Sequence, residues 1–389
     1  MDYYLSHPIQ YFSPLLSAMS ERFELQVYYF SDASVKGNLD KGFHTNVKWD
    51  IPLLDGYHYT FLNNLSPRKS MANRFWDVIN PGVIKKMIKN RSRVVIVNGW
   101  SYFSTLLAIF CAKLLGKRVW LRAESPLNQE LRKNRGVLLC KKIILKYLFF
   151  PLINQFLYIG SENKRFLKFY GVSEKKMIYT PYAVDNNFWR QRHLQFTDRN
   201  VLKEKLSIPF DKKIILFTGK FIEKKRPFDL IKAFQKLKNL NCILIMVGEG
   251  ELRNDMESYI KSEGIRGIIL TGFINQSAIP EYYEVCDVFV MCSGMGETWG
   301  LAVNEAMNFE KPIIVSKTCG CYADLVQEGI NGFLFTEGNI EELRCCIDKV
   351  LADERLCKNA GVASGKIVHD FSIDNIVTNL VKAGENLYS

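Results

Sequence analysis

Short apolar runs alternate with longer segments of helical spacing along most of this 389-residue chain. Residues 94–97 form one such run, residues 104–115 have helical spacing, and residues 118–122 form the next run. Strands of about four to seven residues that alternate with helices of about 12 residues are typical of βαβ units, in which the strands are parallel. The pattern therefore predicts an α/β fold built on parallel sheets.

The alternation occurs in two series, and the second begins at Lys213. Residues 186–210 are polar and mixed, and we interpret them as a linker region. We predict two Rossmann-like, doubly wound domains that face a central cleft, residues 1–190 and residues 191–370, with a C-terminal helix (about 371–389) that returns to the first domain. The strands expected in the second domain are residues 214–218, 242–247, 267–270, 288–291, 313–315 and 333–335.

Composition narrows the class of protein. A chain of this length can bury two full cores, and 48% hydrophobic with 24% charged residues is ordinary globular composition. No apolar run approaches the ~18–20 residues of a membrane span, and the N-terminus lacks the basic and long apolar regions of a signal peptide. Because the ten cysteines show neither a disulfide framework nor metal-ligand spacing, we expect a cytoplasmic protein with reduced thiols and no metal.

The charge is concentrated in the first half of the chain. Residues 1–190 hold 28 Lys and Arg against 13 Asp and Glu, a net charge of +15, so the rest carries −3 of the total of +12. The excess of positive charge on residues 1–190 predicts that this part of the chain has an anionic partner. No basic helix here is combined with a recognised readout module, so we do not expect that partner to be nucleic acid.

A basic amphipathic segment occupies residues 131–153. Arg135, Lys142 and Lys146 fall at i, i+7 and i+11, which places them on one face of a helix. The segment is either a surface helix with solvated lysines or a surface that docks to an anionic membrane, where basic and aromatic residues act together. The sequence leaves both interpretations open.

A glycine-rich loop follows the predicted strand 288–291 and leads into a helix. Such a loop lies at the carboxyl end of a parallel strand, where open α/β sheets bind ligands, and the N–H groups that open a helix favour an anion. Gly296 and Gly300 let the backbone come close to that ligand. Glu297 in the loop and Glu305 in the helix add two carboxylates, so a ligand with both phosphate and hydroxyl groups, such as a nucleotide sugar, fits.

A second loop, after the predicted strand 214–218, is rich in lysine. Gly219 permits a tight turn there, and Lys220, Lys224 and Lys225 follow it. The loop is either an ordinary solvated connection or a set of fixed ammonium groups that neutralise a leaving diphosphate. It lacks the spacing of a Walker loop, and Gly248 and Gly250 lack the third glycine of a dinucleotide fingerprint.

With these motifs in view, the chain resembles the retaining family-4 glycosyltransferases of the GT-B fold. The matching motifs are Glu297-x7-Glu305, Gly219-Lys220 with Lys225, Val247-Gly-Glu-Gly250, Thr271-Gly-Phe-Ile274 and Asn331-Gly-Phe-Leu. The resemblance implies that the second domain binds a nucleoside-diphosphate sugar and the first domain binds the acceptor. It implies no metal, and the sequence has no Asp-x-Asp to hold one at a diphosphate.

The resemblance also implies roles for individual residues. Glu297, Lys225 and Lys220 would be catalytic, with Glu297 at the donor sugar and the lysines at the phosphates. Lys220 stands where the family usually has arginine, so it keeps the charge but loses the bidentate contact. The donor-binding residues implied are Glu305 for the ribose, Gly300 and Leu301 for the phosphates, Ile274 for the base, and Gly219 and Gly296.

The first domain matches the family less well. His7, Gln10, Trp100 and Glu124 sit at predicted strand ends that face the expected cleft, which makes them the candidate acceptor residues. A structural role is the alternative for each of them. The resemblance and the basic first half together predict transfer to a glycan or lipid-linked glycan in bacterial surface polysaccharide synthesis, at the inner face of the membrane. A nucleotide-sugar epimerase and an inactive membrane-associated relative are the alternatives.

Overall fold

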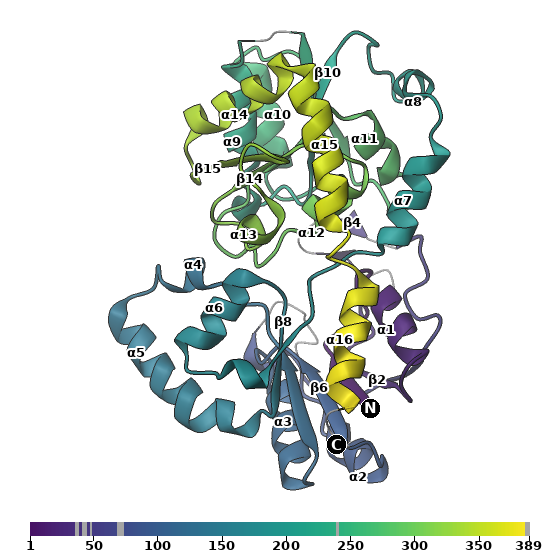
Figure 1. The fold of residues 1–389 in the computed structure, drawn as a ribbon, viewed down its shortest axis with the longest axis vertical. Helices are drawn as coiled ribbons and strands as arrows, with labels where there is room; N and C mark the ends of the chain where they lie inside the picture. Colours follow the sequence, from purple (N-terminus) through teal and green to yellow (C-terminus); the bar gives the residue numbers. More distant parts are fainter. Residues whose placement is uncertain (36–38, 41–44, 47–48, 68–73, 239–240, 386–389) are drawn as a thin grey trace. The chain divides into compact units, whose positions relative to one another are not determined.

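The computed structural model describes residues 1–35, 39–40, 45–46, 49–67, 74–238 and 241–385. These residues form two compact units (Figure 1). The first unit takes in the described parts of residues 1–38, 52–181 and 373–389, and the second those of residues 39–51 and 182–372. Among the described residues, no helix is long and apolar enough to cross a membrane.

The first unit is built on a seven-stranded parallel sheet in the order β5-β2-β1-β6-β7-β8-β9. The strands are β1 (Asp2–Leu5), β2 (Gln26–Tyr29), β5 (His58–Phe61), β6 (Val94–Asn98), β7 (Arg118–Arg122), β8 (Gln155–Tyr158) and β9 (Met177–Tyr179). The helices are α1 (Ser13–Ser20), η1 (Phe75–Asp77), α2 (Gly82–Lys89), α3 (Phe103–Leu114), α4 (Leu127–Glu130), α5 (Arg135–Ile143), η2 (Ile144–Phe149), η3 (Phe150–Leu152), α6 (Ser161–Phe169), η4 (Glu174–Lys176) and α16 (Ile373–Glu385).

The second unit is built on a six-stranded parallel sheet in the order β12-β11-β10-β13-β14-β15. Its strands are β10 (Lys213–Thr218), β11 (Cys242–Val247), β12 (Ile268–Gly272), β13 (Val288–Met291), β14 (Ile313–Ser316) and β15 (Gly332–Phe335), and β3 (Leu39–Asp40) and β4 (Thr45–Asn46) form a separate antiparallel pair. Its helices are α7 (Asn186–Gln195), α8 (Arg199–Lys205), η5 (Glu223–Lys225), α9 (Pro227–Gln235), α10 (Arg253–Ser262), α11 (Ile279–Val285), α12 (Leu301–Asn308), α13 (Tyr322–Leu325), α14 (Ile340–Ala352) and α15 (Glu354–Val368).

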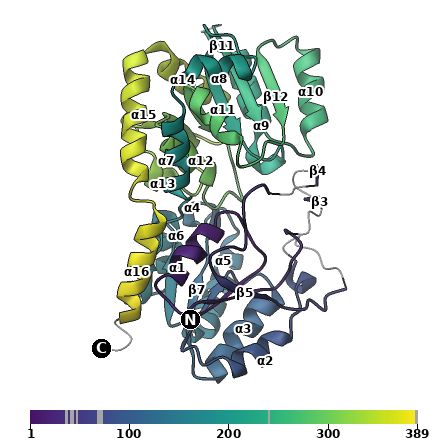
Figure 2. The same cartoon turned by 90° about the vertical axis from the view of Figure 1, so that its right-hand side faces the viewer.

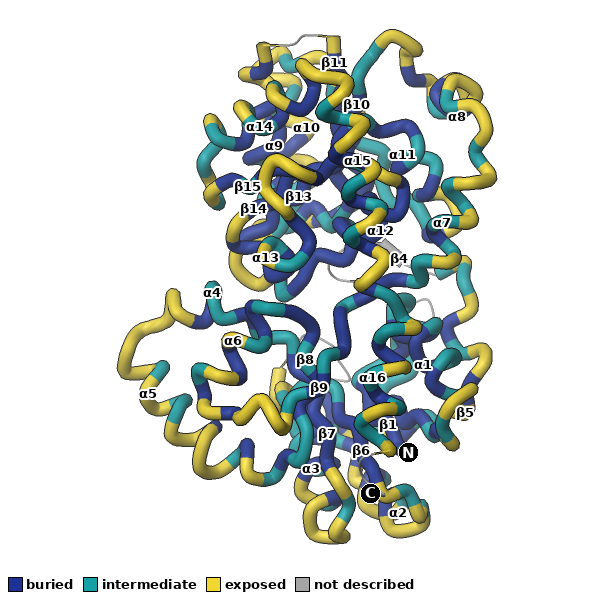
Figure 3. The backbone as a smooth tube through the Cα atoms, viewed as in Figure 1, coloured by how far each residue is buried: buried dark blue, intermediate teal, exposed yellow. Residues whose placement is uncertain are grey.

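The central strands of both sheets are buried, as Figure 3 shows, whereas the edge strands β5 and β12 are partly exposed. Alternate side chains of a strand point to opposite faces, so an apolar run such as β10 serves two cores at once. Ile215 and Phe217 of β10 pack with residues of α9 and α14, while α11 and α12 lie on the other face of this sheet. In the first unit, α16 packs on α1 and on β9, so the C-terminal helix joins the N-terminal sheet (Figure 2). The predicted doubly wound α/β architecture is confirmed.

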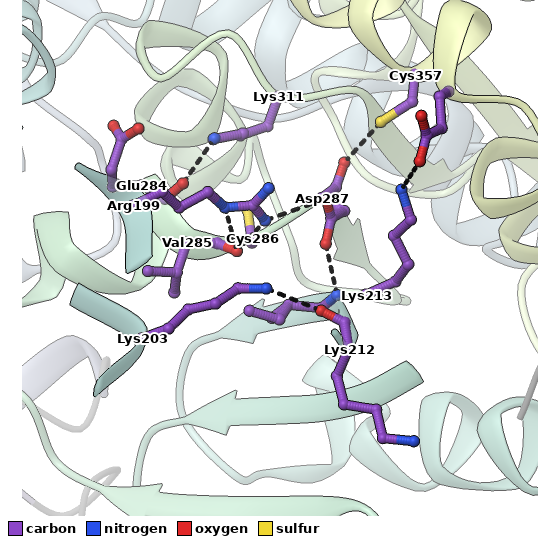
Figure 4. A network of polar contacts seen from close by, with 12 residues as sticks. Arg199, Lys203, Lys212, Lys213, Glu284, Val285, Cys286, Asp287, Lys311 and Cys357 are labelled. Atoms are coloured by element: carbon purple, nitrogen blue, oxygen red, sulfur yellow. Dashed lines mark hydrogen bonds and ion pairs between the residues drawn. The ribbon is translucent and has the colours of Figure 1, made fainter. Parts of the chain in front are cut away.

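The predicted linker at residues 186–210 is wrong, because this segment forms α7 and α8 and packs on the second unit. Trp189 of α7 is buried against Tyr283 and Phe309, with ring centroids 5.7 and 6.1 Å apart. Figure 4 shows how α8 is held: Arg199 pairs with Asp287 at 3.0 Å, and Asp287 in turn accepts the N–H of residue 214 at 2.7 Å. Arg199, one of the polar residues that suggested a linker, is therefore tied to the amino end of the sheet.

The basic segment at residues 131–153 is helical, as predicted, but its geometry changes along its length. An α-helix over Arg135–Ile143 is followed by a π-helical turn over Ile144–Phe149, which has a longer period than 3.6 residues. The single basic face predicted from α-helical spacing therefore does not extend to Lys146. Lys142 lies over the ring of Phe169, 4.9 Å from its centroid.

Candidate donor-binding site

The second sheet has a topological switch point between β10 and β13. From β10 the chain first winds outward through β11 and β12, then returns to the other side of β10 with β13 and continues outward. In doubly wound sheets ligands bind outside the carboxyl ends of the strands at such a point. The lysine-rich loop follows β10 and the glycine-rich loop follows β13, so both predicted motifs lie at this position.

Close backbone packing positions the lysine-rich loop. The N–H of Gly219 donates to the carbonyl of Val247 at 2.9 Å, which extends the pairing of β10 and β11. A Cβ atom on Gly248 would lie 1.8 Å from the carbonyl oxygen of Gly219, so glycine is required at 248. The N–H of Phe221 donates to the carbonyl of Glu249 at 2.8 Å and holds the next part of the loop. The backbone of the loop is therefore fixed on both sides of Lys220 and ahead of Lys224 and Lys225.

Lys225 and Glu297 form a salt bridge, although 72 residues separate them in the sequence. Lys225 ends the short helix η5, and Glu297 is held by the N–H of Gly320, which donates to its carbonyl at 3.1 Å. Burial opposes the charged form of each group, but the partner's charge outweighs it. As a result the pKa of Lys225 is raised and the pKa of Glu297 is lowered, with Lys224 adding to the second shift. Both groups stay ionised in this pair.

Two further ammonium groups surround the pair. Desolvation lowers the pKa of Lys224, Glu297 opposes that shift, and the charges of Lys225 and Lys220 add to it. The ammonium of Lys224 also lies 3.5 Å from the carbonyl oxygen of Gly296. Three lysines and one carboxylate therefore share this corner, and the excess of positive charge suits an anionic ligand.

The helix α12 begins at this corner with its first N–H groups open to a ligand. Its N-cap is Gly300, at φ 103°, which provides no side-chain cap for those groups. A Cβ on Gly300 would lie 2.9 Å from the Sγ of Cys319, so space and backbone conformation both require glycine. The N–H groups of Leu301 and its successor lie in the first helical turn, where they have no partner within the helix, and the helix dipole favours an anion there.

Glu305 lies on α12 and belongs to a different network from Glu297. It is buried, and its carboxylate accepts a hydrogen bond of 2.6 Å from the hydroxyl of Tyr283. That hydroxyl is also 2.8 Å from the Oγ1 of Thr218, the last residue of β10. Tyr283 thus fixes Glu305 beside the switch point. No spacing in the sequence marks Tyr283 as part of the site, because it comes from α11 on the face of the sheet.

Ile274, the predicted base contact, follows β12 at the same carboxyl edge as the two loops. It is half-buried, and the ring of its neighbour Phe273 lies 5.9 Å from the ring of Trp49, measured between centroids. Ile274 is two strands away from β10, so the structure does not group it with the salt bridge. Its role in binding a base stays a prediction.

The candidate acceptor residues of the first unit also follow neighbouring strands. His7 follows β1, and its Nδ1 is 3.0 Å from the Oγ of Ser6. Gln10 lies half-buried in the turn before α1. Their neighbours at the same edge are Trp100 after β6 and Glu124 after β7.

Two of these candidates have clear structural contacts. Trp100 packs among three phenylalanine rings, Phe149, Phe150 and Phe166, with centroids 5.6–6.1 Å away. Glu124 lies 3.8 Å from the guanidinium of the buried Arg122. For Trp100 this packing supports the structural interpretation, while the acceptor roles of all four residues stay predictions.

Within the described residues, no group of three or more His, Cys, Asp or Glu side chains is arranged to hold a metal ion. The site itself offers lysine ammonium groups, helix N–H groups and carboxylates that accept hydrogen bonds.

Residues 198–366 match the model of the family described as glycosyl transferases group 1. This stretch of the chain is similar to the glycosyl transferases group 1 family. The matched segment contains both loops at the switch point, the helix α12 and Tyr283. The family resemblance predicted from the motifs is confirmed.

Curated relatives are similar to this chain over part of its length. The uncharacterized glycosyltransferase MJ1607 of Methanocaldococcus jannaschii is 27% identical over 53% of this chain and 52% of its own length. The alpha-monoglucosyldiacylglycerol synthase of Acholeplasma laidlawii is 31% identical over 36% of this chain and 35% of its own. The chain thus spans about half, or less, of the length of these relatives.

Solved structures match over nearly the whole chain. Anabaena Alr3699/HepE, in a structure with UDP and glucose, gives a TM-score of 0.73 at 16% identity and covers 99% of both chains. A glycosyltransferase from Rickettsia africae gives a TM-score of 0.75 at 16% identity, with 100% of this chain and 98% of that chain covered. At this identity the likeness establishes the fold, which is GT-B.

Proposed function

We propose that the protein is a retaining glycosyltransferase that takes a sugar from a nucleoside-diphosphate sugar. The observation that carries this proposal is the salt bridge of Lys225 with Glu297 at the switch point, beside Lys220 and Lys224. A diphosphate that leaves the donor needs positive charge in place before the reaction starts, and these lysines are held by the fold. The match of residues 198–366 to the glycosyl transferases group 1 model supports this donor class. So does the structure of the similar Anabaena protein in complex with UDP-glucose.

Each part of the site has a role in this proposal. Lys225 and Lys220, with the N–H groups that open α12 at Gly300 and Leu301, stabilise the departing diphosphate. Glu305, held by Tyr283, accepts hydrogen bonds from the ribose. Glu297 contacts the donor sugar near its reacting carbon. Because the site has no residue that we assign as a nucleophile, we favour transfer on the front face of the sugar, assisted by the leaving phosphate.

A thermal-shift screen of the full chain against uridine, guanosine and adenosine diphosphate sugars tests the donor. A ligand that binds the folded form raises its melting temperature, by an amount that grows with concentration over Kd. We expect one nucleotide class to stabilise the wild type and to stabilise the Lys225→Ala variant much less. No shift with any of them refutes the proposal. Conversion of the sugar to an epimer without an acceptor would select the epimerase alternative.

We propose that the first domain predicted from the sequence, residues 1–190 with about 371–389, binds the acceptor, a glycan or lipid-linked glycan at an anionic membrane surface. The half of the chain with net charge +15 supports this, as do the exposed apolar residues of α5 and η2. Ile143, Ile144, Tyr147 and Leu148 are all exposed there beside lysines. Among the relatives, the Campylobacter jejuni protein is named for a PP-undecaprenol-linked glycan and the Salmonella typhimurium protein for lipopolysaccharide. Bacterial surface polysaccharide synthesis is the proposed setting.

Co-sedimentation with phosphatidylglycerol and phosphatidylcholine vesicles tests the membrane contact. We expect binding to the anionic vesicles alone, loss of binding at high salt, and loss in a Tyr147→Asp/Leu148→Asp variant. Leu194→Asp is the matched control, because Leu194 is exposed in the second unit. Equal binding to both kinds of vesicle, or equal loss in the control, would count against this part of the proposal.

A further inference from the structure

Three aromatic rings of the first unit pack on one another: the exposed Phe75 and Trp76 and the half-buried Phe103, which we name the aromatic platform. Trp76 stacks on Phe103 with centroids 5.2 Å apart and planes at 26°. Phe75 meets both rings edge-on, at 4.7 and 6.1 Å. Even with these contacts, Trp76 keeps 58% of its surface exposed. Exposed large aromatic groups of this kind mark binding surfaces more often than scattered single residues do.

The backbone beneath the platform is held by buried polar side chains. The hydroxyl of Ser66 donates to the carbonyl of Trp76 at 2.7 Å, and Asn64 donates to the carbonyl of Asp77 at 3.1 Å. Asn80 donates its N–H to the hydroxyl of Ser104 at 2.8 Å, which ties η1 to the start of α3. These hydrogen bonds fix the backbone that carries Trp76, and preorganisation of this kind lowers the cost of binding.

The same asparagine fixes where the platform lies. The side-chain amide of Asn80 donates to the carbonyls of Phe30 and Leu62, at 3.0 and 3.1 Å, and these residues directly follow β2 and β5. Phe103 begins α3, which follows β6. The platform therefore stands at the carboxyl edge of the first sheet, the edge at which α/β sheets bind ligands and at which His7 also lies.

We propose that the aromatic platform binds one sugar ring of the acceptor, which stacks on the open part of the Trp76 indole. The inference rests on the proposed function, because a glycosyltransferase must hold an acceptor in its first unit while the donor occupies the second. An indole face carries partial negative charge and the C–H bonds of a sugar ring point partial positive charge at it. Aromatic residues, above all Trp, also contribute a large share of the binding energy at the interfaces where they are found.

The test is saturation-transfer NMR on the full chain with methyl glycosides and disaccharides of glucose, galactose, N-acetylglucosamine and N-acetylgalactosamine as probes. We expect saturation to reach the ring protons of at least one probe, about tenfold weaker affinity for Trp76→Ala, and near wild-type affinity for Trp76→Phe. Phe210→Ala is the matched control, because Phe210 is 59% exposed in the second unit. It should bind the probe as the wild type does.

Three results overturn the inference: no probe binds the wild type, Trp76→Ala binds as tightly as the wild type, or Trp76→Ala loses only its sedimentation with phosphatidylglycerol vesicles. The third would make the platform a membrane contact. Thermal shift with the nucleotide sugars on the same samples separates this inference from the proposed function. If nucleotide sugars stabilise the wild type and Trp76→Ala equally while the glycosides fail, only the acceptor platform is refuted.

Discussion

The salt bridge between Lys225 and Glu297 allows catalysis and stability to be separated by three variants. Lys225→Met and Glu297→Gln each remove one charge while keeping most of the side-chain volume, and the double variant removes both. In either single variant the remaining charge is left without its partner at a position where the side chains of Lys225 and Glu297 are only 15% and 11% exposed. The double variant leaves no such charge behind.

The structure sets the size of the expected effect. Breaking a fully buried pair by removing one partner costs about 3–5 kcal/mol, and some exposure here lowers that to about 2–3 kcal/mol. For a domain of about 150–250 residues each kcal/mol shifts the melting temperature by about 2–4 °C, so each single variant should melt about 4–12 °C lower. The melting temperature of the double variant should fall by less than the sum of the two single decreases, because the two changes are coupled.

Turnover, unlike stability, should not recover in the double variant. Loss of Lys225 removes one preorganised charge from the leaving diphosphate, which costs about 10²-fold or more in turnover. The double variant should therefore regain stability and remain inactive. Urea or thermal unfolding measures the first effect, and release of nucleoside diphosphate in the presence of acceptor measures the second. Near-normal turnover in Lys225→Met, or strictly additive stability losses, would refute this account of the pair.

Three further predictions concern the same site. Gly300→Ala should destabilise the second unit by about 1–3 kcal/mol and weaken the thermal shift given by nucleotide sugars, because the new Cβ meets Cys319 at a φ of 103°. Tyr283→Phe should raise the KM for the donor about tenfold and leave kcat nearly unchanged, since it removes one hydrogen bond to the carboxyl group of Glu305. The stability difference between wild type and Lys225→Met/Glu297→Gln should be constant between about pH 5 and pH 10. It should shrink below that range as Glu297, whose pKa is lowered from the ordinary 4.5, gains a proton, and above it as Lys225, whose pKa is raised from the ordinary 10.5, loses its proton.

Two fully apolar strands, and one with an arginine at each end, were predictable from the sequence to the residue. The ranges 118–122, 242–247 and 288–291 coincide with β7, β11 and β13. A parallel strand buried on both faces reads as an uninterrupted apolar run, and polar residues mark both of its ends. The predicted strand 267–270 is shifted, because β12 covers Ile268–Gly272 and is less buried than its neighbours.

The helices α7 and α8 were missed because they lack an amphipathic pattern. In α7 only Trp189 is buried, so nearly the whole helix surface is polar and no 3.6-residue period of apolar residues results. Local signals were nevertheless present. Asp185 and Asp198 are N-caps whose carboxylates accept the N–H groups of Phe188 and Asn200, at 3.0 and 2.7 Å. Aspartate before a polar segment predicts a helix start more reliably than polarity predicts a linker.

At the site, residue spacing identified the loops but not the pairing of their side chains. Parallel strands bring their carboxyl ends to one edge, so two loops after β10 and β13 must be neighbours once the sheet order is known. Lys225 and Glu297 must therefore lie in the same region, but the sheet order does not determine whether their side chains are in contact. Which ammonium meets which carboxylate depends on side-chain direction, and that follows from the packing of η5 and Gly320, which no sequence period encodes.

The two glutamates of the Glu-x7-Glu motif therefore have different chemistry despite their shared residue type. Glu297 lies in a loop, where it meets a cation, and its charge is balanced before a ligand arrives. Glu305 lies on α12, where it accepts a hydrogen bond from the hydroxyl of Tyr283. In the proposed function, a diphosphate at the lysines competes with Glu297 for Lys225, and a ribose meets the carboxylate that Tyr283 positions. Under that proposal the first carboxylate responds to the charge of the donor, and the second holds its ribose.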